Sequence, residues 1–380
     1  METITHPLSR RRFAGMLGAG AVAAWLRPAP ASPEAAAPAP AAAPAPAAGP
    51  VRLNSNENPY GPSPAALAAM RDALPFAWRY PDDEVDQLTA AIAADHGVPA
   101  DHLLLGPGSN EILRLAAAAF SGPDRKVVMA DPTFEAIGGY ARPTGAEVVK
   151  VPLTADFRHD LAKMQAVAGA GLVYVCNPNN PTASLTPKRE IRDFIAAINA
   201  LKGKTTVLVD EAYHHFAESP DYETVIPLVA DNPHLVVART FSKIHGLAGL
   251  RCGYAVARPE TIERLWLHRA WDVGNIMALV AARASLGDPA YLERTRRLNR
   301  ETRDFVVTEV DRLGYRTIPS QANFVMIDLR REARAVIDAL RQRDVRVGRV
   351  FPALPNHLRV SLGTREQMEA FLAAFRQVMV

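Results

Sequence analysis

Short apolar runs rich in valine recur between residues 126 and 257, and a helix-length segment separates each run from the next. Runs of about five residues with many β-branched side chains are typical of buried strands. Strands that alternate with helices form a mainly parallel sheet that is covered on both faces. We therefore expect an α/β domain with strands at Lys126–Ala130, Glu147–Val151, Leu172–Cys176, Thr205–Val209, Leu235–Ala238 and Cys252–Ala257.

The pattern changes after about Asp288, where a long helix rich in arginine and glutamate is expected over Tyr291–Leu313. Two strands are expected after it, near Phe324–Asp328 and Leu358–Leu362. Helices and strands that are grouped in this way predict a smaller α+β domain. We divide the folded part into an N-terminal arm with part of the small domain (51–80), a large domain (81–285) and a C-terminal small domain (286–380).

The first fifty residues have the pattern of an export signal followed by a linker. An arginine triplet at 10–12 precedes a 14-residue weakly apolar stretch, Phe13–Leu26, and then small residues that offer several cleavage sites, one of them after Ala31. This layout resembles a bacterial twin-arginine signal over 1–31 and implies a periplasmic or otherwise exported protein. The stretch is shorter than the roughly 20 residues that span a bilayer. A disordered tail with a chance arginine triplet, on a cytoplasmic protein, is the alternative.

The segment after the signal, 32–50, is rich in alanine and proline and predicts an extended, semi-rigid linker. The formal net charge of the chain is +3, of which +2 lies in the first 49 residues. A nearly neutral folded part gives no electrostatic reason to expect a nucleic acid or an acidic membrane as a partner.

Metal and disulfide chemistry are not indicated. The two cysteines, Cys176 and Cys252, each lie in an apolar run, so we expect buried free thiols. His245 and the pair His214 and His215 stand near the polar motifs of the chain but have no third ligand in sight. We expect these histidines to support the site or to lie on a helix surface, and no metal to be bound.

A lysine in a turn after a buried strand is the first residue with chemical potential. Lys243 follows the run Leu235–Ala238 and precedes a stretch of small residues that ends at Arg251. Burial and a neighbouring cation lower the pKa of an amine enough to make it a nucleophile. Ser242 and Arg251 could hold a phosphate, for which the guanidinium fork is well suited. Taken alone, a solvated surface lysine would be the default interpretation.

Polar residues also follow two other expected strands, and a further polar stretch precedes an expected helix. Asp210 ends an apolar run, and a buried carboxylate needs a partner such as a ring N–H, although an N-cap is the simpler role. Asn180 lies in a stretch with two X-Pro bonds that forces a turn. The stretch 106–111, Gly-Pro-Gly-Ser-Asn-Glu, precedes an expected helix over Ile112–Phe120 and could cradle an anion at the helix start. It lacks the third glycine of the dinucleotide fingerprint.

A lysine, a buried acid and an anion cradle are the groups that pyridoxal 5′-phosphate (PLP) catalysis requires. The order and spacing of these motifs resemble the fold-type I, aspartate-aminotransferase-like family of PLP enzymes, class I/II, and most closely its histidinol-phosphate aminotransferase branch. The matching stretches run from 53–62, Leu-Asn-Ser-Asn-Glu-Asn-Pro-Tyr-Gly-Pro, to 359–364, Arg-Val-Ser-Leu-Gly-Thr. The resemblance implies a large domain with a mainly parallel seven-stranded sheet and a smaller α+β domain.

The resemblance also implies a role for each site residue. Lys243 would form the Schiff base with the cofactor, Asp210 would pair with the pyridinium nitrogen, and Tyr213 and Asn180 would bind the ring oxygen. The remaining cofactor residues would be Ser109, Asn110, Phe134, Ser242, Arg251 and, reaching the phosphate of a neighbouring subunit in a homodimer, Tyr80. The substrate residues would be Arg359, Asn323, Tyr60 and Arg349. Ala183 stands where the family usually has glycine, which would cost about 1 kcal/mol if the position needs a positive φ.

The expected reaction is ping-pong transfer of an amino group between an amino acid, or a histidinol-phosphate-like amine, and a 2-oxo acid. A PLP-dependent decarboxylase or other lyase of the same fold shares nearly all these residues and remains the alternative. A non-catalytic binding protein on the same scaffold is a third possibility, against which the complete set of Lys243, Asp210, Tyr213 and Arg251 argues. Arg359 favours a substrate with a carboxylate or a phosphate but does not select one.

Overall fold

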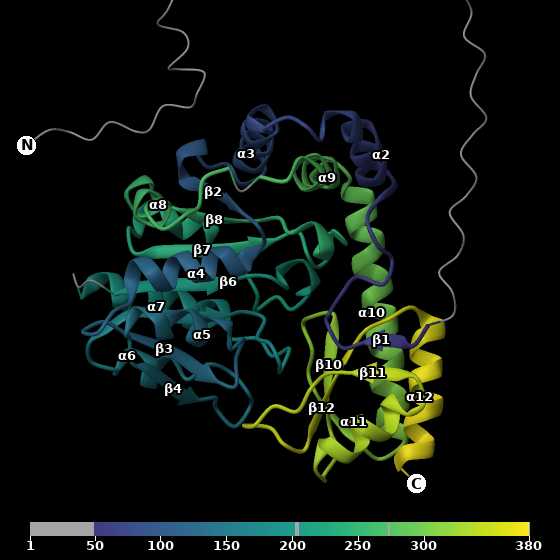
Figure 1. Cartoon of the computed structure of the whole chain (residues 1–380). Coiled ribbons are helices and arrows are strands. Elements are labelled where there is room, and N and C mark those ends of the chain that lie inside the picture. Colours follow the sequence, from purple (N-terminus) through teal and green to yellow (C-terminus); the bar gives the residue numbers. More distant parts are fainter. Residues whose placement is uncertain (1–48, 202–204, 273, 380) are drawn as a thin grey trace, which may run out of the picture. The chain divides into compact units, whose positions relative to one another are not determined.

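The computed structural model describes residues 49–201, 205–272 and 274–379 (Figure 1). The predicted export signal and nearly all of the predicted linker lie outside these ranges. Within the described part, the strands form three separate sheets.

The largest sheet has seven strands among the described residues, in the order β2-β8-β7-β6-β5-β3-β4. Strands β3 to β7 run parallel to one another, whereas β8 is antiparallel to β7 and to β2. The predicted mainly parallel seven-stranded sheet is therefore confirmed. Its strands are β2 (Leu103–Gly106), β3 (Lys126–Asp131), β4 (Val148–Pro152), β5 (Ala170–Cys176), β6 (Thr206–Asp210), β7 (Leu235–Thr240) and β8 (Gly253–Ala257).

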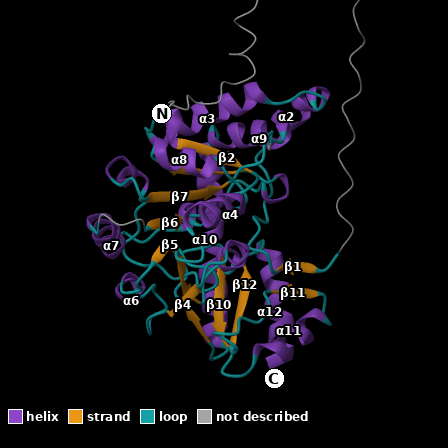
Figure 2. Ribbon diagram, turned by 60° about the vertical axis from the view of Figure 1, so that its left-hand side comes forward, coloured by secondary structure: helices purple, strands orange, loops and turns teal. Residues whose placement is uncertain are grey.

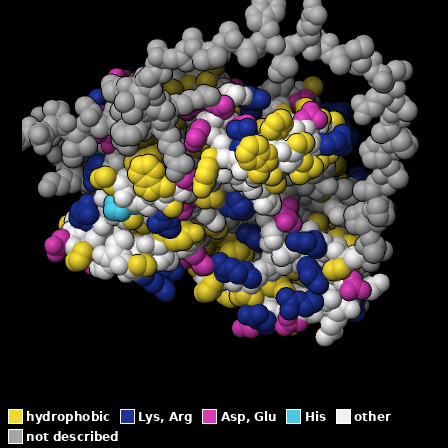
Figure 3. Space-filling model, turned by 45° about the horizontal axis from the view of Figure 1, so that its top comes forward, with side chains coloured by type: hydrophobic (Ala, Val, Ile, Leu, Met, Phe, Trp, Pro, Cys, Tyr) yellow, Lys and Arg dark blue, Asp and Glu magenta, His cyan; other side chains and the backbone are white. Residues whose placement is uncertain are grey.

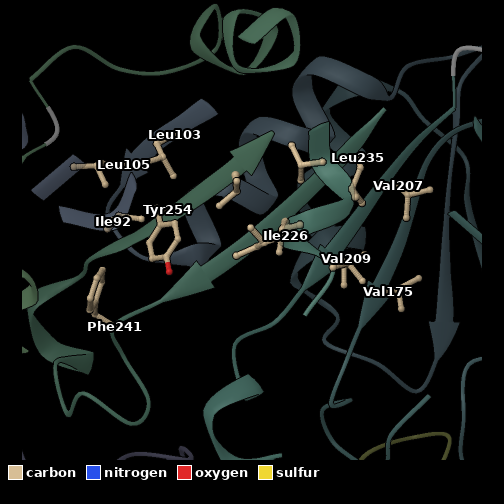
Figure 4. Close-up of a cluster of buried hydrophobic side chains, with 14 of the residues drawn as sticks. Ile92, Leu103, Leu105, Val175, Val207, Val209, Ile226, Leu235, Phe241 and Tyr254 are labelled. Atoms are coloured by element: carbon tan, nitrogen blue, oxygen red, sulfur yellow. The ribbon is translucent and has the colours of Figure 1, made fainter. Parts of the chain in front are cut away.

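Helices cover both faces of this sheet because successive strand residues point to opposite sides and both sides are apolar. In β6, for example, Leu208 packs on one side, and Val207 and Val209 pack on the other. The side of Leu208 is covered by α4 (Ser109–Phe120), α5 (Ala136–Ala141) and α8 (Pro259–Trp266). The opposite side, shown in Figure 4, is covered by α3 (Asp82–His96), α6 (Leu161–Gln165), α7 (Lys188–Ala200) and α9 (Ile276–Leu286), with α2 (Pro64–Ala73) packed on α9.

The two smaller sheets lie with the C-terminal helices (Figure 2). One is antiparallel, in the order β12-β10-β9, and the other pairs β1 with β11 in parallel. Segments that are far apart in sequence therefore meet in one sheet, because β1 comes directly after the predicted linker. The elements are β1 (Val51–Leu53), β9 (Arg316–Ile318), β10 (Phe324–Asp328), β11 (Val345–Val347), β12 (His357–Ser361), α10 (Pro289–Arg312), α11 (Ala333–Arg341) and α12 (Arg365–Met379).

The carboxyl ends of the parallel strands bring the polar motifs of the sequence together. Strands β3, β5, β6 and β7 end at Asp131, Cys176, Asp210 and Thr240, and each is followed by a loop. Ligands of open α/β sheets bind beyond these ends. The functional site is therefore expected at this edge of the sheet.

Candidate active site

One cavity of about 290 Å³ lies at the carboxyl ends of the parallel strands. Ten of the residues predicted from the sequence line it, although they come from six separate stretches of the chain. These are Ser109, Asn110, Phe134, Asn180, Asp210, Tyr213, Ser242, Lys243, Arg251 and Arg359. The cavity is also lined by residues that had not been assigned to the site from the sequence, namely Ser55, Asn56, Glu57, Cys176, Ala212, Thr240 and Ala248.

One end of the cavity is built to hold an anion. Helix α4 begins at Ser109, three residues earlier than expected, because Gly108 adopts φ 84° and turns the chain into the helix there. The first N–H groups of a helix have no partner within it and carry partial positive charge. Arg251 lies beside them, donating to Ser242 Oγ (3.2 Å) and to the Pro107 carbonyl (3.4 Å). A Cβ on Gly108 would lie 2.3 Å from Arg251 Nη2, so only glycine leaves room for this arrangement.

Lys243 lies in the turn after β7 and is half-buried. Its Nζ donates to the carbonyl oxygens of Asn56 (3.1 Å) and Ser55 (3.3 Å). Burial, followed by the Arg359 cation, lowers the pKa of Lys243 to about 8. An appreciable fraction of the amine is therefore unprotonated near neutral pH, and this is the form that attacks an aldehyde or accepts a proton.

Asp210 ends β6 at the cavity wall and is 3% exposed. Burial raises the pKa of Asp210 to about 6, and hydrogen bonds to the carboxylate oppose that shift. The Tyr174 hydroxyl donates to Oδ2 (2.9 Å) and the Ala212 N–H donates to Oδ1 (3.1 Å). The group is thus mostly ionised at neutral pH, and each carboxylate oxygen retains capacity to accept a further bond.

The opposite wall comes from the N-terminal arm and from β12. Asn56 adopts φ 53° and donates from Nδ2 to the Tyr213 hydroxyl (3.0 Å). Arg359 donates to Asn180 Oδ1 (2.7 Å) and to the Asn54 carbonyl (2.8 Å). Its Nε is buried and has no hydrogen-bond partner. A buried guanidinium with an unused donor is suited to an anionic substrate group.

Four of the predicted site residues do not line this cavity. Asn323 lies behind its wall, where it donates to the Asn56 carbonyl (3.0 Å). Tyr60 lines a small separate pocket. Tyr80 is 65% exposed in the stretch between α2 and α3. Arg349 forms an ion pair with Glu135, at a distance of 2.6 Å between Nη2 and Oε2.

The position that departs from the family pattern, Ala183, adopts φ 58°, so the chain does need a positive φ there. The residue is fully buried, and its cluster includes Tyr213, Phe216 and Ile244. This packing of the methyl group offsets part of the backbone strain.

The histidines near the motifs belong to one cluster behind the cavity, formed by His96, His214, His215 and His245. The His214 and His215 ring centroids are 3.5 Å apart, and those of His215 and His245 are 5.1 Å apart. Both residues of the predicted pair lie in the 3-10 turn His214–Phe216, not on an α-helix surface. Burial lowers the pKa of every histidine in the cluster. Among the described residues, no group of three His, Cys, Asp or Glu side chains is arranged to hold a metal ion.

The two cysteines are both buried and unpaired, as expected. In the part of the chain that the structure describes, no helix has the length and apolar character needed to cross a membrane.

Comparison with known proteins agrees with this geometry. The family model for aminotransferase class I and II matches residues 48–375. The histidinol-phosphate aminotransferase of Symbiobacterium thermophilum is 42% identical over 332 residues, which cover 87% of this chain and 90% of that protein. The enzyme of the same name from Moorella thermoacetica is 39% identical over 334 residues, covering 87% of this chain and 85% of that protein.

A solved structure supports the same assignment. The crystal structure of histidinol-phosphate aminotransferase from Sinorhizobium meliloti in complex with pyridoxal-5′-phosphate superposes with a TM-score of 0.81 at 29% identity, covering 86% of this chain and 90% of that one. The family match extends over nearly all of the described residues and includes every residue that lines the cavity. The chain therefore belongs to the aminotransferase class I and II family.

Proposed function

We propose that the cavity at the strand ends is the site at which this PLP-dependent aminotransferase holds its cofactor and exchanges an amino group between an amino donor and a 2-oxo acid. The observation that carries the assignment to this cavity is the presence, around one cavity, of an amine, an ionised acid and an anion cradle. Bound PLP supplies an aldehyde for an amine to attack and an electron-withdrawing ring that acidifies the substrate α-carbon.

The residues present fit this cofactor. The start of α4 with Ser109 and Asn110, together with Ser242 and Arg251, would hold the phosphate. The tight space at Gly108 supports this assignment, because an added Cβ would displace the Arg251 guanidinium that would bind the phosphate.

The ring would be bound by the residues of the opposite walls. Asp210 is an acid kept ionised beside Lys243 and would pair with the ring nitrogen. Phe134 would stack on the ring, and Asn180 and Tyr213 would bind the ring oxygen.

Lys243 has two roles in this proposal. Its amine would hold the cofactor at the aldehyde, and the same amine, when free, would move the proton of the substrate α-carbon. A pKa of about 8 suits both roles, because the amine is readily deprotonated near neutral pH yet basic enough to take up a proton. Hydrogen bonds to the backbone of Ser55 and Asn56 keep the amine inside the cavity.

The substrate carries an anionic group, which the Arg359 guanidinium at the cavity wall would bind. We further propose a histidinol-phosphate-like amine as a donor. The names of the relatives support this, as does the position of Arg349, whose Cζ lies over the same Phe351 ring as that of Arg359. Asn323 and Tyr60 act from behind the wall, Asn323 by fixing the arm residue Asn56.

The direct test is to add PLP to the purified protein, reduce with borohydride, and identify the modified peptide. We expect a single adduct on Lys243 and none in the Lys243→Ala variant, whereas an adduct on another lysine would overturn the proposal. Amino donors, including histidinol phosphate, are then screened one at a time in single half-reactions. An aminotransferase leaves pyridoxamine phosphate, and release of carbon dioxide without it would point to a decarboxylase of the same fold.

We also propose that the enzyme is a homodimer in which Tyr80 reaches the phosphate site of the partner. Large apolar side chains gather on the face of α2, α3 and the loops beside them (Figure 3). The exposed residues of this kind that lie there or in the loop after α8 include Leu74, Phe76, Trp78, Tyr80, Leu267 and Trp271. Large apolar side chains that are exposed together on one face are typical of an interface. Sedimentation of the wild type and of Trp78→Glu would test it, since a monomeric wild type would refute the proposal.

Export by the twin-arginine route and the domain boundaries complete the proposal. We propose that 1–31 is the signal and 32–50 the linker, and that 51–80, 81–285 and 286–380 are the arm, the large domain and the small domain. Support for the arm comes from β1, which pairs with β11 of the small domain.

Support for export is the arginine triplet alone. Fractionation of cells that express the wild type or a variant with Arg10 and Arg11 changed to lysine would test it, and equal cytoplasmic retention of both would contradict it.

A further inference from the structure

The carboxylate of Asp210 receives a hydrogen bond from a side chain that none of the proposed steps uses. Tyr174 lies two residues before the end of β5, the strand next to β6, and its hydroxyl donates to Asp210 Oδ2 at 2.9 Å. Strand register makes this contact possible, because Cys176 is the direct partner of Asp210 and Tyr174 is the partner of Leu208. Tyr174 and Leu208 point to the face of the sheet that α4 covers, and Asp210, two residues after Leu208 on the same strand, points to that face too.

The surroundings of Tyr174 make its hydroxyl unusual. The residue is fully buried, and its cluster consists mainly of aliphatic side chains of the sheet and of the helices that cover it, such as Leu113 and Leu208. Phenylalanine would fill this space without placing a polar atom in it, and a buried hydroxyl without a partner is costly. Its partner is an equally buried carboxylate, and a hydrogen bond between a neutral donor and an ionised acceptor is among the strong ones.

Several charged or titratable groups act on the same carboxylate. Lys243 approaches from the loop after β7 and favours ionisation, whereas Glu211, the next residue along the chain, opposes it. Cys176 and Tyr213 also face it but stay neutral, because burial raises the pKa of each well above its usual range. Tyr174 is kept neutral in the same way, so it acts as a fixed proton donor.

We propose that Tyr174 is a positioning residue for the reaction: its hydroxyl keeps Asp210 ionised and holds one carboxylate oxygen in place, so that the carboxylate presents its remaining lone pairs to the ring nitrogen of the cofactor. This inference rests on the proposed role of Asp210. Burial raises the pKa of Asp210, and the hydrogen bond from Tyr174 counteracts that rise. Without the hydroxyl, the carboxyl therefore takes up a proton nearer to neutral pH. A protonated Asp210 no longer forms an ion pair with a charged ring nitrogen.

The first experiment uses the cofactor-free protein, so it is independent of activity. Tyr174→Phe removes the hydroxyl and nothing else, and Tyr254→Phe is the matched control. Tyr254 is also buried, on β8, and its hydroxyl bonds to His96 instead of Asp210. With aspartate labelled by ¹³C at the carboxyl carbon, and the Asp210 signal identified by its absence in Asp210→Asn, NMR titration follows the pKa of Asp210. We expect Tyr174→Phe to raise that pKa by about one to two pH units and Tyr254→Phe to leave it as in the wild type.

The second experiment measures binding of PLP and of its 1-deaza analogue, in which a C–H replaces the ring nitrogen. The ratio of the two dissociation constants reports how strongly the protein uses that nitrogen. At pH 7 we expect Tyr174→Phe to reduce the preference for PLP about tenfold, and Tyr254→Phe to leave it unchanged. An unchanged pKa of Asp210 in Tyr174→Phe, or an unchanged preference, would overturn the role of Tyr174.

The variant Asp210→Asn separates the role of Asp210 from that of Tyr174. If Asp210→Asn loses the preference for PLP while Tyr174→Phe keeps it, the role proposed for Asp210 stands and only that of Tyr174 falls. If Asp210→Asn keeps the preference, the proposed function of Asp210 itself is wrong.

Discussion

We expect the variant His245→Asn to lose less stability in acid than the wild type does. His245 is 2% exposed, and its Nδ1 lies 2.6 Å from Ser285 Oγ. Burial, followed by the nearby Arg239 cation, lowers the pKa of His245 to about 3, compared with about 6.5 in an unfolded chain. The folded protein therefore keeps this ring neutral over a pH range in which the unfolded chain protonates it.

The direction and size of the effect follow from proton linkage. Stability that depends on neutral His245 is fully present above about pH 6.5 and is lost as the pH falls toward the folded-state value, because the unfolded state binds the extra proton. Each pH unit in this window costs about 1.4 kcal/mol per histidine, so about 2 kcal/mol is lost by about pH 5. Burial lowers the pKa of His96 and of His159 to about 4, and both add to the same slope. Asp210 opposes it, since its raised pKa favours the folded state in acid.

Urea unfolding of the cofactor-free protein at pH 8 and at pH 5 measures this loss. The comparison is made between the two pH values within each protein, so that any constant effect of a substitution cancels. We expect His245→Asn to lose about 2 kcal/mol less than the wild type. We expect His268→Asn, which replaces an exposed histidine two residues after α8, to lose as much as the wild type. Equal losses in the wild type and in His245→Asn would refute the reasoning.

Three further substitutions test the packing around the cavity. Glu211→Gln leaves the buried Arg239 without the carboxylate that lies 2.7 Å away, and we expect the free energy of unfolding to fall by about 3–5 kcal/mol in a urea titration at pH 8. Gly108→Ala would place a Cβ 2.3 Å from Arg251 Nη2, and we expect the dissociation constant for PLP, followed by absorbance, to rise at least about tenfold. Gly253→Ala would place a Cβ 2.5 Å from the backbone nitrogen that begins α4; because backbone cannot move aside, we expect no cooperative thermal transition.

Each of these substitutions has a control in the same chain. Glu147→Gln breaks an ion pair with Lys126 that is largely exposed, and we expect a loss of at most about 1 kcal/mol. Gly249→Ala adds a Cβ with nothing within 4 Å, so it should alter neither PLP binding nor the thermal transition. If a control variant changed stability or PLP binding as much as its test variant, the contacts of Glu211, Gly108 and Gly253 would not be the cause of the change.

The sequence contains enough information to predict the parallel sheet and most of the cavity lining. Apolar runs of fixed length identify strands, and the polar residue after each run must then lie at the common edge. Lys243, Asp210 and Asn180 were placed by this reasoning, and all three line the cavity. Strand β2 was missed, because its four residues, Leu103–Gly106, give too short a pattern to separate from a helix.

Contacts made across the fold were not predictable in the same way. Asn56 contacts Tyr213, Lys243, Asn323 and Ser361, all of which lie more than 150 residues away in the sequence. Nothing in the local sequence of Asn56 predicts these long-range contacts, although the stretch around it did contribute to the family resemblance.

Tyr174 shows why some site residues cannot be found from a sequence pattern. It lies inside Leu172–Cys176, and the uninterrupted apolar character of that run is what identifies a buried strand. The same pattern makes the tyrosine look like one more core side chain. Its hydroxyl gains a function only because β5 and β6 pair with Cys176 opposite Asp210, which brings a residue two positions earlier within reach of the carboxylate. A shift of one residue in that register would turn the ring to the other face of the sheet and leave Asp210 without this donor.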